Sequence, residues 1–197
     1  MSVANETRVD RRTFVAALMQ QVPEALVITG LGSPSYDAFA AGDRPANFYL
    51  WGAMGGAAAM GLGLALAQPE RSVLVITGDG EQMMGVGALA TIAVKQPRNL
   101  TIAVLDNGYF GETGMQRSHT GHGADLAAVA RGFGIGDAFR VDALSGAAEI
   151  AQRVVSRAGP ALAQVLIGAD SPARAMPPRD GVFLKNRFRA ALGLAPF

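Results

Sequence analysis

Apolar residues fall in short runs that alternate with helical patterns along the chain. Residues 25–29, 72–77, 99–105 and 161–167 are largely apolar, which predicts buried strands, and residues 47–50 and 139–141 predict two shorter ones. Helical spacing predicts helices over residues 11–22, 33–41, 55–68, 85–95, 125–133, 147–158 and 183–192. This alternation predicts an α/β fold, a doubly wound and mostly parallel sheet with helices on both faces. A ligand is expected beyond the carboxyl ends of its strands.

One of these helices lies in a segment that is long enough to span a bilayer. Residues 50–67 form an uncharged run of 18 residues. The run holds five glycines and six alanines, so its hydrophobicity is low and a buried helix is the better interpretation. Residues 1–12 are polar and lack the apolar stretch of a signal peptide. We therefore expect a cytoplasmic protein with no membrane partner.

Composition limits the chemistry that the chain can perform. Its 197 residues, half of them hydrophobic, are enough for one domain with a real core. Cysteine is absent, which excludes disulfides, thiol catalysis, and zinc or iron–sulfur sites held by cysteine. The net charge of +1 gives no reason to expect nucleic acid or a membrane surface as a partner.

The composition changes after residue 168. Residues 170–181 are rich in proline and arginine, and a short basic helix with Lys185, Arg187 and Arg189 follows. We therefore divide the chain into an α/β domain, residues 1–168, and a C-terminal arm with a short helix, residues 169–197. Such a tail is expected to pack on its own domain or on a partner subunit.

Two strand ends carry the residues that are most informative about chemistry. Gly78, Asp79, Gly80 and Glu81 follow one predicted strand, and the turn at residues 106–109 follows the next, 25 residues further on. That interval holds one crossover helix and one strand, so the two loops are expected side by side above the sheet. The Asp79 carboxylate and the Asn107 amide oxygen are hard ligands that suit Mg²⁺, and the glycines let backbone N–H groups approach phosphate. The alternative is a pair of ordinary strand-end turns.

At these residues the sequence resembles the thiamine-diphosphate-dependent enzymes, whose signature is a GDG followed by an asparagine turn. The resemblance implies a domain that binds thiamine diphosphate and Mg²⁺, with Asp79, Asn107 and the backbone carbonyl of Tyr109 as metal ligands. It also implies that Gly52 accepts a hydrogen bond from the aminopyrimidine and that Met54 wedges between the rings of the cofactor. The cofactor-binding residues expected from it are Gly30, Gly32, Ser33, Gly52, Met54, Gly78, Asp79, Gly80, Glu81, Asn107, Tyr109, Phe110 and Gly111.

Two of these expectations have alternatives. Ser33 could cap the helix that follows it, which is compatible with a contact to phosphate. The glycine spacing at Gly52, Gly55 and Ala57 imitates a dinucleotide fingerprint. No clean strand precedes that segment and no acidic residue follows a second strand at the required distance, so the fingerprint is a poor match.

The run from Leu105 to Gln116 resembles the sulfopyruvate and phosphonopyruvate decarboxylases within this family. That resemblance implies a lyase that decarboxylates a 2-oxo acid. It also implies a hetero-oligomer, in which a pyrimidine-binding partner subunit supplies the glutamate that activates the cofactor. The alternatives are an acetolactate-synthase-like carboligase subunit, a non-catalytic cofactor-binding or scaffold subunit, and a generic nucleotide-binding module.

No residue of this chain is assigned as a certain catalytic group. Glu112 and Thr113 follow the metal loop, where related decarboxylases place substrate-pocket residues. His119 and His122, the only histidines, lie in a Gly/Ser/Thr-rich stretch and could bind an anionic group of the substrate together with Arg117. The alternative for each of the four candidates is a solvated surface position.

Overall fold

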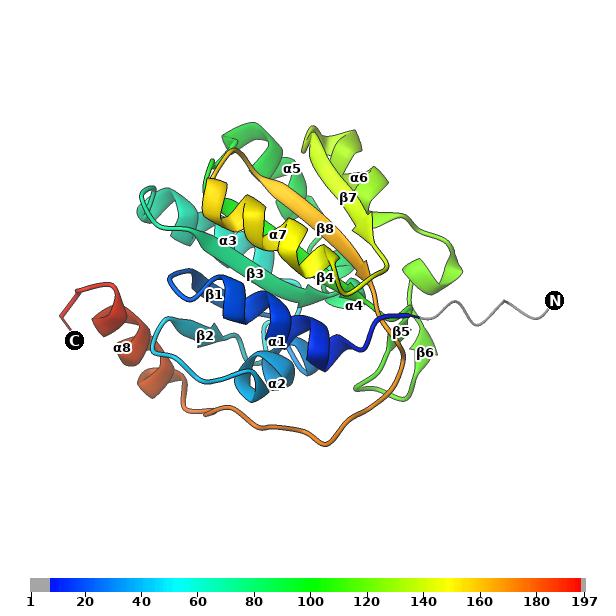
Figure 1. The fold of residues 1–197 in the computed structure, drawn as a ribbon, viewed down its shortest axis with the longest axis horizontal. Helices are drawn as coiled ribbons and strands as arrows, with labels where there is room; N and C mark the ends of the chain where they lie inside the picture. Colours follow the sequence, from blue (N-terminus) through cyan, green and yellow to red (C-terminus); the bar gives the residue numbers. More distant parts are fainter. Residues whose placement is uncertain (1–7, 196–197) are drawn as a thin grey trace.

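The computed structural model describes residues 8–195, and Figure 1 shows its fold. Most of the polar segment 1–12 therefore lies outside the described residues. The strands of the main sheet are β1 (Leu26–Thr29), β2 (Asn47–Tyr49), β3 (Val73–Gly78), β4 (Leu100–Asp106), β7 (Asp137–Val141) and β8 (Ala161–Leu166). The helices are α1 (Arg11–Gln21), α2 (Ser33–Ala40), α3 (Ala57–Ala67), α4 (Asp79–Met84), α5 (Gly87–Lys95), α6 (Leu126–Phe133), α7 (Gly146–Ser156) and α8 (Gly181–Ala191). A small hairpin, β5 (Tyr109–Phe110) and β6 (Gln116–Arg117), precedes the 3₁₀ turn η1 (Thr120–His122).

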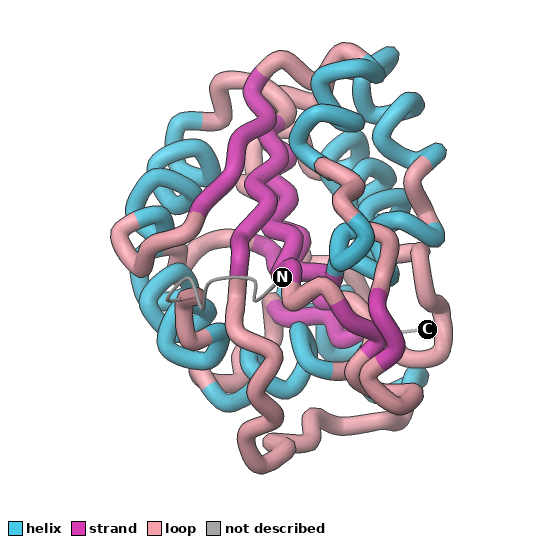
Figure 2. Tube along the Cα trace, turned by 90° about the vertical axis from the view of Figure 1, so that its right-hand side faces the viewer, coloured by secondary structure: helices cyan, strands magenta, loops and turns pink. Residues whose placement is uncertain are grey.

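The main sheet has the predicted parallel topology. Within residues 8–195 its order is β2-β1-β3-β4-β8-β7, and every neighbouring pair is parallel. In Figure 2 the sheet runs between helices on its two sides. Strands β1, β3, β4 and β8 are buried along almost their whole length, as expected for a sheet that helices cover on both faces. The α/β prediction is therefore confirmed.

Each face of the sheet has its own hydrophobic core. One core packs α1 and α7 against the sheet through residues such as Phe14, Leu18 and Ile150. The other packs α3 and α5 against the opposite face through residues such as Leu62 and Ile92. The chain therefore builds three layers, and the loops at the carboxyl ends of the strands remain free for ligand binding.

Helix α3 shows why the run 50–67 is rich in small residues. A side chain at Gly61 would bring its Cβ within 2.3 Å of Val75 Cγ2 on β3, so glycine allows the helix to approach the sheet closely. Ala57, Ala58 and Ala65 are buried on the same helix. Among the helices of residues 8–195, none has the length and hydropathy that a bilayer crossing requires.

The C-terminal arm follows its own domain. In Figure 1 it passes along the side of α2 before it reaches α8. Arg12 Nη1 on α1 donates to the carbonyl oxygen of Ala173 at 2.9 Å. Trp51 Nε1 donates to the carbonyl oxygen of Pro178, also at 2.9 Å. Two hydrogen bonds from separate parts of the domain thus hold the arm in place.

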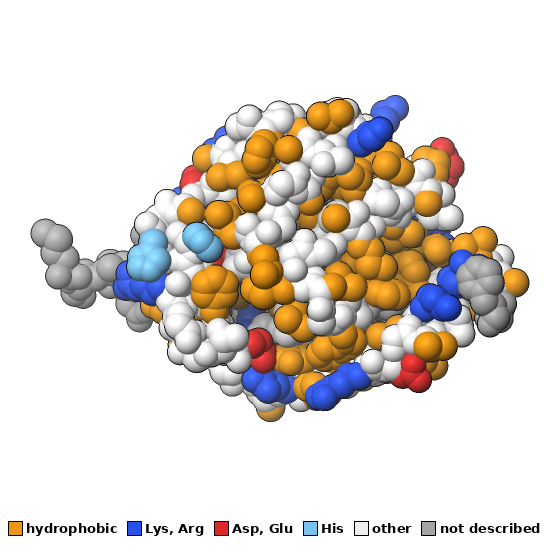
Figure 3. All heavy atoms as spheres, turned by 180° about the vertical axis from the view of Figure 1, so that it is seen from behind, with side chains coloured by type: hydrophobic (Ala, Val, Ile, Leu, Met, Phe, Trp, Pro, Cys, Tyr) orange, Lys and Arg blue, Asp and Glu red, His pale blue; other side chains and the backbone are white. Residues whose placement is uncertain are grey.

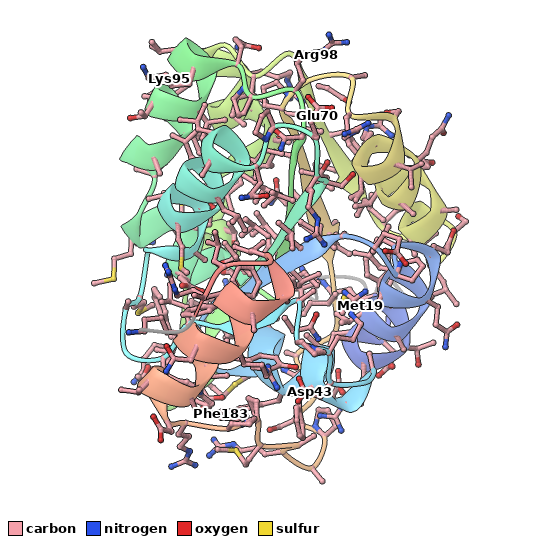
Figure 4. All side chains as sticks on the ribbon, turned by 90° about the vertical axis from the view of Figure 1, so that its left-hand side faces the viewer. Met19, Asp43, Glu70, Lys95, Arg98 and Phe183 are labelled. Carbon is pink, nitrogen blue, oxygen red and sulfur yellow. The ribbon has the colours of Figure 1, made fainter. Side chains whose placement is uncertain are left out.

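Helix α8 packs on the edge of the sheet at β2. Phe188 meets the Phe48 ring edge to face, with the ring centroids 5.6 Å apart. Arg187 pairs with Asp43 at 2.6 Å and lies over the Phe183 ring, and Figure 4 labels Asp43 and Phe183 at this end of the molecule. The division of the chain into a domain (residues 1–168) and an arm with a helix (residues 169–197) stays a prediction. Contacts between the two parts within one chain do not test it.

Candidate active site

Neighbouring strands bring the two predicted loops together. β3 pairs with β4 in parallel, with Gly78 opposite Leu105, so both strands end at the same edge of the sheet. Asp79 comes directly after β3, and Asn107 comes directly after β4. The two strand ends that carry these residues therefore lie side by side, as the sequence predicts.

The segment after β3 differs from the prediction of a loop. Helix α4 begins at Asp79 and runs to Met84. Gly78 precedes it with an extended backbone, and Asp79 and Glu81 lie in its first turn. Acidic side chains are stabilised at this position because the N-terminus of a helix carries partial positive charge. The short length of α4 and the glycine within it conceal the helix in the sequence.

A pocket opens at this edge of the sheet. It encloses about 950 Å³ of empty space, the open solvent at its mouth included. The predicted residues that line it are Ser33, Met54, Gly78, Asp79, Gly80, Glu81, Asn107, Tyr109, Phe110, Gly111, Glu112 and Thr113. Gly30, Gly32, Gly52, His119 and His122 are not among its lining residues. Most of the predicted cofactor site thus converges on one pocket.

Asp79 lies at the base of the pocket, where hydroxyl groups hold it. Its side chain is 2% exposed. Its Oδ2 accepts hydrogen bonds from Ser118 Oγ and, at 2.9 Å, from Thr120 Oγ1. Thr120 Oγ1 also lies 2.7 Å from Asp106 Oδ1, so one hydroxyl stands between two carboxyl groups. Burial, together with the charge of Asp106, raises the pKa of Asp79 above its ordinary value.

The loop after β4 brings these hydroxyls to Asp79 by a close backbone contact. The Ser118 N–H donates to the carbonyl oxygen of Gly108 at 2.9 Å. A side chain on Gly121 would place its Cβ 2.3 Å from that same oxygen, so only glycine fits there. The sequence singles out His119 and His122 in this stretch, whereas Ser118, Thr120 and Gly121 between and beside them make the contacts. The one local signal in the sequence for these contacts is that two hydroxyl residues, Ser118 and Thr120, lie two positions apart.

The oxygen atoms at this base are suitable for Mg²⁺. Asp79 offers a carboxylate, Asn107 an amide oxygen and Tyr109 a backbone carbonyl, and all three residues line the pocket. The Tyr109 N–H donates to Asn107 Oδ1 at 2.9 Å, which fixes the turn that carries both residues. Such hard oxygen ligands, few in number, match an ion that keeps positions for water and phosphate. Among residues 8–195, no three or more His, Cys, Asp or Glu side chains are grouped so that they could hold a metal ion.

The charge of the pocket wall also favours a cation. Four carboxyl side chains line the pocket (Asp79, Glu81, Glu112 and Asp170) against two guanidinium groups (Arg11 and Arg174). Gly78 adds open backbone, because a Cβ built there would meet no atom within 4 Å. The residues present therefore suit a diphosphate bound together with a divalent ion.

Glu81 joins the ends of β1 and β3. Its Oε2 accepts hydrogen bonds from Thr77 Oγ1 at 2.8 Å and from the Leu31 N–H at 3.1 Å. The same carboxyl group fills the space beside Gly30, where a Cβ would lie 1.7 Å from Oε2. Burial raises the pKa of Glu81 above its ordinary value. Glu81 and Gly30 thus shape the turn that leads to Ser33, and Gly30 does so without lining the pocket.

Gly80 has a packing role at the pocket wall. A Cβ at this position would lie 2.3 Å from the Phe110 ring, so the glycine lets the ring rest against α4. The His119 ring meets the Phe110 ring edge to face, with the two ring centroids 6.3 Å apart. Both histidines are visible at the surface in Figure 3. Their predicted contact with substrate stays a prediction.

The segment before α3 presents Met54 to the pocket. Met54 is 40% exposed, which is high for a large apolar side chain that lines a cavity. Gly52 has a φ of +68° and no atom within 4 Å of a Cβ built on it, so the backbone there is open and left-handed. The roles expected for Met54 and for the Gly52 carbonyl stay predictions, and the geometry leaves both residues accessible to a ligand.

Two arginines in the pocket wall were not singled out in the sequence. Arg11, at the start of α1, is 5% exposed and donates through Nη1 to Ser33 Oγ at 2.7 Å. Arg174, in the C-terminal arm, pairs with Glu112 at 2.9 Å. Both are distant in the sequence from the residues they contact, so no local pattern indicates them.

Comparison with known proteins identifies the family. The model of the thiamine pyrophosphate enzyme C-terminal TPP-binding domain matches residues 33–165. The sulfopyruvate decarboxylase subunit beta of Methanocaldococcus jannaschii is 38% identical over 126 residues, which are 64% of this chain and 66% of that one. The phosphonopyruvate decarboxylase of Streptomyces viridochromogenes is 35% identical over 191 residues, which are 94% of this chain and 48% of that one. The chain thus spans less than two thirds of the length of these curated relatives.

Solved structures show the same fold. The thiamine diphosphate-dependent 4-hydroxybenzoylformate decarboxylase of Rhodococcus jostii superposes with a TM-score of 0.70 at 20% identity, over 86% of this chain and 34% of that one. At this identity the likeness establishes the fold alone. The family match covers more than half of the chain and includes the strand ends that carry Asp79 and Asn107. The chain belongs to the family of the C-terminal, thiamine pyrophosphate-binding domain of thiamine pyrophosphate enzymes.

Proposed function

We propose that the chain is the diphosphate-binding subunit of a thiamine-diphosphate- and Mg²⁺-dependent 2-oxo acid decarboxylase of the sulfopyruvate or phosphonopyruvate type. The observation that carries this proposal is the pocket in which Asp79, Asn107 and Tyr109 meet beyond β3 and β4. The names of the curated relatives, sulfopyruvate decarboxylase and phosphonopyruvate decarboxylase, support the reaction class. The proposed substrate is a 2-oxo acid of this class, without a choice between sulfopyruvate and phosphonopyruvate.

In this proposal Asp79, Asn107 and the Tyr109 carbonyl hold Mg²⁺, and the backbone at Gly78 and the hydroxyl of Ser33 hold the diphosphate. Gly52 and Met54 support the ring end. When bound, thiamine diphosphate supplies the nucleophilic carbon that adds to the carbonyl group of a 2-oxo acid. The chain's own part is to orient the cofactor and to exclude water. The apolar residues that line the pocket, among them Leu31, Leu105 and Ile167, serve this purpose.

We further propose that a pyrimidine-binding partner subunit supplies the activating glutamate. The two glutamates of the pocket are engaged elsewhere, Glu81 with Thr77 and Glu112 with Arg174, which supports a source outside this chain. Large apolar side chains are exposed on and beside the α3–α5 side of the sheet, and Figure 3 shows apolar side chains gathered on that face. They include Met54, Leu66, Met84 and Val94, of which Met84 is 68% and Val94 81% exposed. A partner that covers them would shield this apolar surface from water.

Glu112, Thr113, His119 and His122 remain the proposed substrate-pocket residues. Glu112 and Thr113 line the pocket, which favours them over the two histidines. A bound 2-oxo acid would meet Glu112 beside its ion-pair partner Arg174.

Purification of the tagged chain from its own cells, with Mg²⁺ and thiamine diphosphate present, tests this function. Native mass spectrometry is expected to find a second subunit, the cofactor and the metal in one assembly. The assembly should then release CO₂ from trial 2-oxo acids and form the corresponding aldehyde. A ligated product in place of the aldehyde would identify a carboligase. An assembly that binds the cofactor but turns over no 2-oxo acid would indicate a scaffold subunit, and absence of the cofactor would refute the proposal.

A further inference from the structure

Two arginines occupy the first turn of α1, where a positive charge is unfavourable. The N-terminus of a helix carries partial positive charge, so basic residues are normally placed at the other end. Arg11 and Arg12 are the first two residues of α1. A local arrangement that opposes this preference needs a compensating contact, and such conflicts tend to occur at functional sites.

Two carboxylates lie close to these arginines. Asp37 of α2 is fully buried and pairs with both arginines, with Arg11 Nε at 2.9 Å and with Arg12 Nε at 3.0 Å. Asp10, the N-cap of α1, adds a second negative charge beside them. Arg11 is 5% exposed, so water screens its attraction to an anion in the pocket poorly.

Arg11 faces the pocket beside a hydroxyl that can also donate. Arg11 and Ser33 both line the pocket, and Arg11 Nη1 donates to Ser33 Oγ at 2.7 Å. Because Ser33 accepts this bond, the proton of its hydroxyl is available for an acceptor in the pocket. Ser33 is the first residue of α2, and no side chain caps that helix, whose N-cap is Gly32. In the first turn Pro34 has no N–H group, and the Ser35 N–H donates to the carbonyl oxygen of Gly32 at 2.9 Å, so the turn offers a ligand the N–H and the hydroxyl of Ser33.

We propose that Arg11, supported by Asp37, binds the diphosphate of the cofactor together with Ser33 at the start of α2. This inference rests on the proposed function and adds a residue that the family match does not include, since the match begins at residue 33. A guanidinium group can donate two parallel hydrogen bonds to a phosphate, which suits Arg11 to this role. Arg11 and Ser33 would then hold the diphosphate together with the residues proposed to hold Mg²⁺.

Titration calorimetry with Mg²⁺ and inorganic pyrophosphate as the probe tests this inference. The protein is used as purified, with any subunit that accompanies it. Arg11→Gln is expected to weaken pyrophosphate binding by about tenfold to a hundredfold, the range for a hydrogen bond to a charged group. Arg153→Gln on α7, whose ion-pair partner is Asp137 and which does not line this pocket, is the matched control and should leave the affinity within about twofold of the wild type. An unchanged affinity in Arg11→Gln would overturn the inference.

Further variants distinguish a direct contact between Arg11 and the diphosphate from an indirect role. Arg11→Lys keeps the charge but loses the paired donors, so binding several-fold weaker than wild type is expected, and this variant carries the test should Arg11→Gln not fold. If Arg11 acted only by orienting Ser33, Arg11→Gln would add nothing to Ser33→Ala, and that result would overturn a direct contact. A loss of methylphosphonate binding with intact pyrophosphate binding would assign Arg11 to a substrate tail and also overturn the inference. Absence of pyrophosphate binding in the wild type and in Asp79→Ala alike would refute the proposed function itself.

Discussion

Replacing Gly30 with alanine tests the link between the turn after β1 and the start of α4. The new Cβ would lie 1.7 Å from Glu81 Oε2, far inside the contact distance of the two atoms. That oxygen cannot move without loss, because it accepts hydrogen bonds from Thr77 Oγ1 and from the Leu31 N–H. The substitution therefore forces a buried carboxyl group away from its partners.

The expected effect follows from those two contacts. Hydrogen bonds to a charged group contribute about 1.5–3 kcal/mol each, and overpacking alone destabilises by about 1–3 kcal/mol. Because these effects are not additive, we expect Gly30→Ala to lower the free energy of unfolding by about 2–5 kcal/mol. For a chain of this size that corresponds to a fall in Tm of roughly 4–20 °C. Urea and thermal unfolding followed by circular dichroism measure it.

Two further variants make the interpretation specific. Gly132→Ala on α6 is the matched control, because a Cβ at Gly132 meets no atom within 4 Å, and it should stabilise the protein by about 0.5–1 kcal/mol. In a Glu81→Ala background the space beside Gly30 is free, so Gly30→Ala should then have little further effect. An equal loss of stability from Gly30→Ala in both backgrounds would refute the reasoning.

Three other contacts give separate predictions. Thr120→Val keeps the side-chain volume but removes the hydroxyl that bonds Asp79, so the free energy of unfolding in urea should fall by about 1–3 kcal/mol, and an unchanged midpoint would contradict the contact. Arg174→Gln removes an exposed ion pair with Glu112, so stability should change by less than about 1 kcal/mol while hydrogen exchange over residues 169–180 becomes faster; identical exchange would show that the pair does not hold the arm. Asp10→Ala removes the N-cap of α1 and should lower Tm at pH 7 by an amount equivalent to about 0.5–2 kcal/mol. The hydrogen bonds from Thr13 lower the pKa of Asp10. The contribution of Asp10 to stability is therefore present above the ordinary carboxyl pKa and is lost as the pH falls through the folded-state pKa. A difference in Tm between Asp10→Ala and the wild type that persists in acid would contradict this assignment.

The strands were predictable because a strand that is buried on both faces is apolar at nearly every position. β3 and β4 are apolar almost throughout, and their observed bounds differ from the predicted runs by a residue at either end. Helix α4 was not predictable in the same way. It has six residues and a glycine at its second position, and the packing of Gly80 against Phe110 stabilises it through contacts that the local sequence does not contain.

The proposed metal ligands could be named from the sequence because they follow strand ends at a spacing that one crossover connection sets. The contacts that support these ligands could not be predicted from the sequence. Ser118 reaches Asp79 across 39 residues of sequence, and Arg11 reaches Ser33 across 22. Arg174 reaches Glu112 across 62, by way of an extended arm. Such contacts depend on the arrangement of elements in space, and hydrophobic periodicity does not encode them.

The binding of thiamine diphosphate in the presence and absence of Mg²⁺ tests the central claim most directly. Titration calorimetry of the purified protein, with the subunit that accompanies it, should show saturable binding that EDTA abolishes. Asp79→Ala and Asn107→Ala should each abolish binding while circular dichroism shows the wild-type fold. Binding that persists in Asp79→Ala, or that does not depend on the metal, would contradict the account.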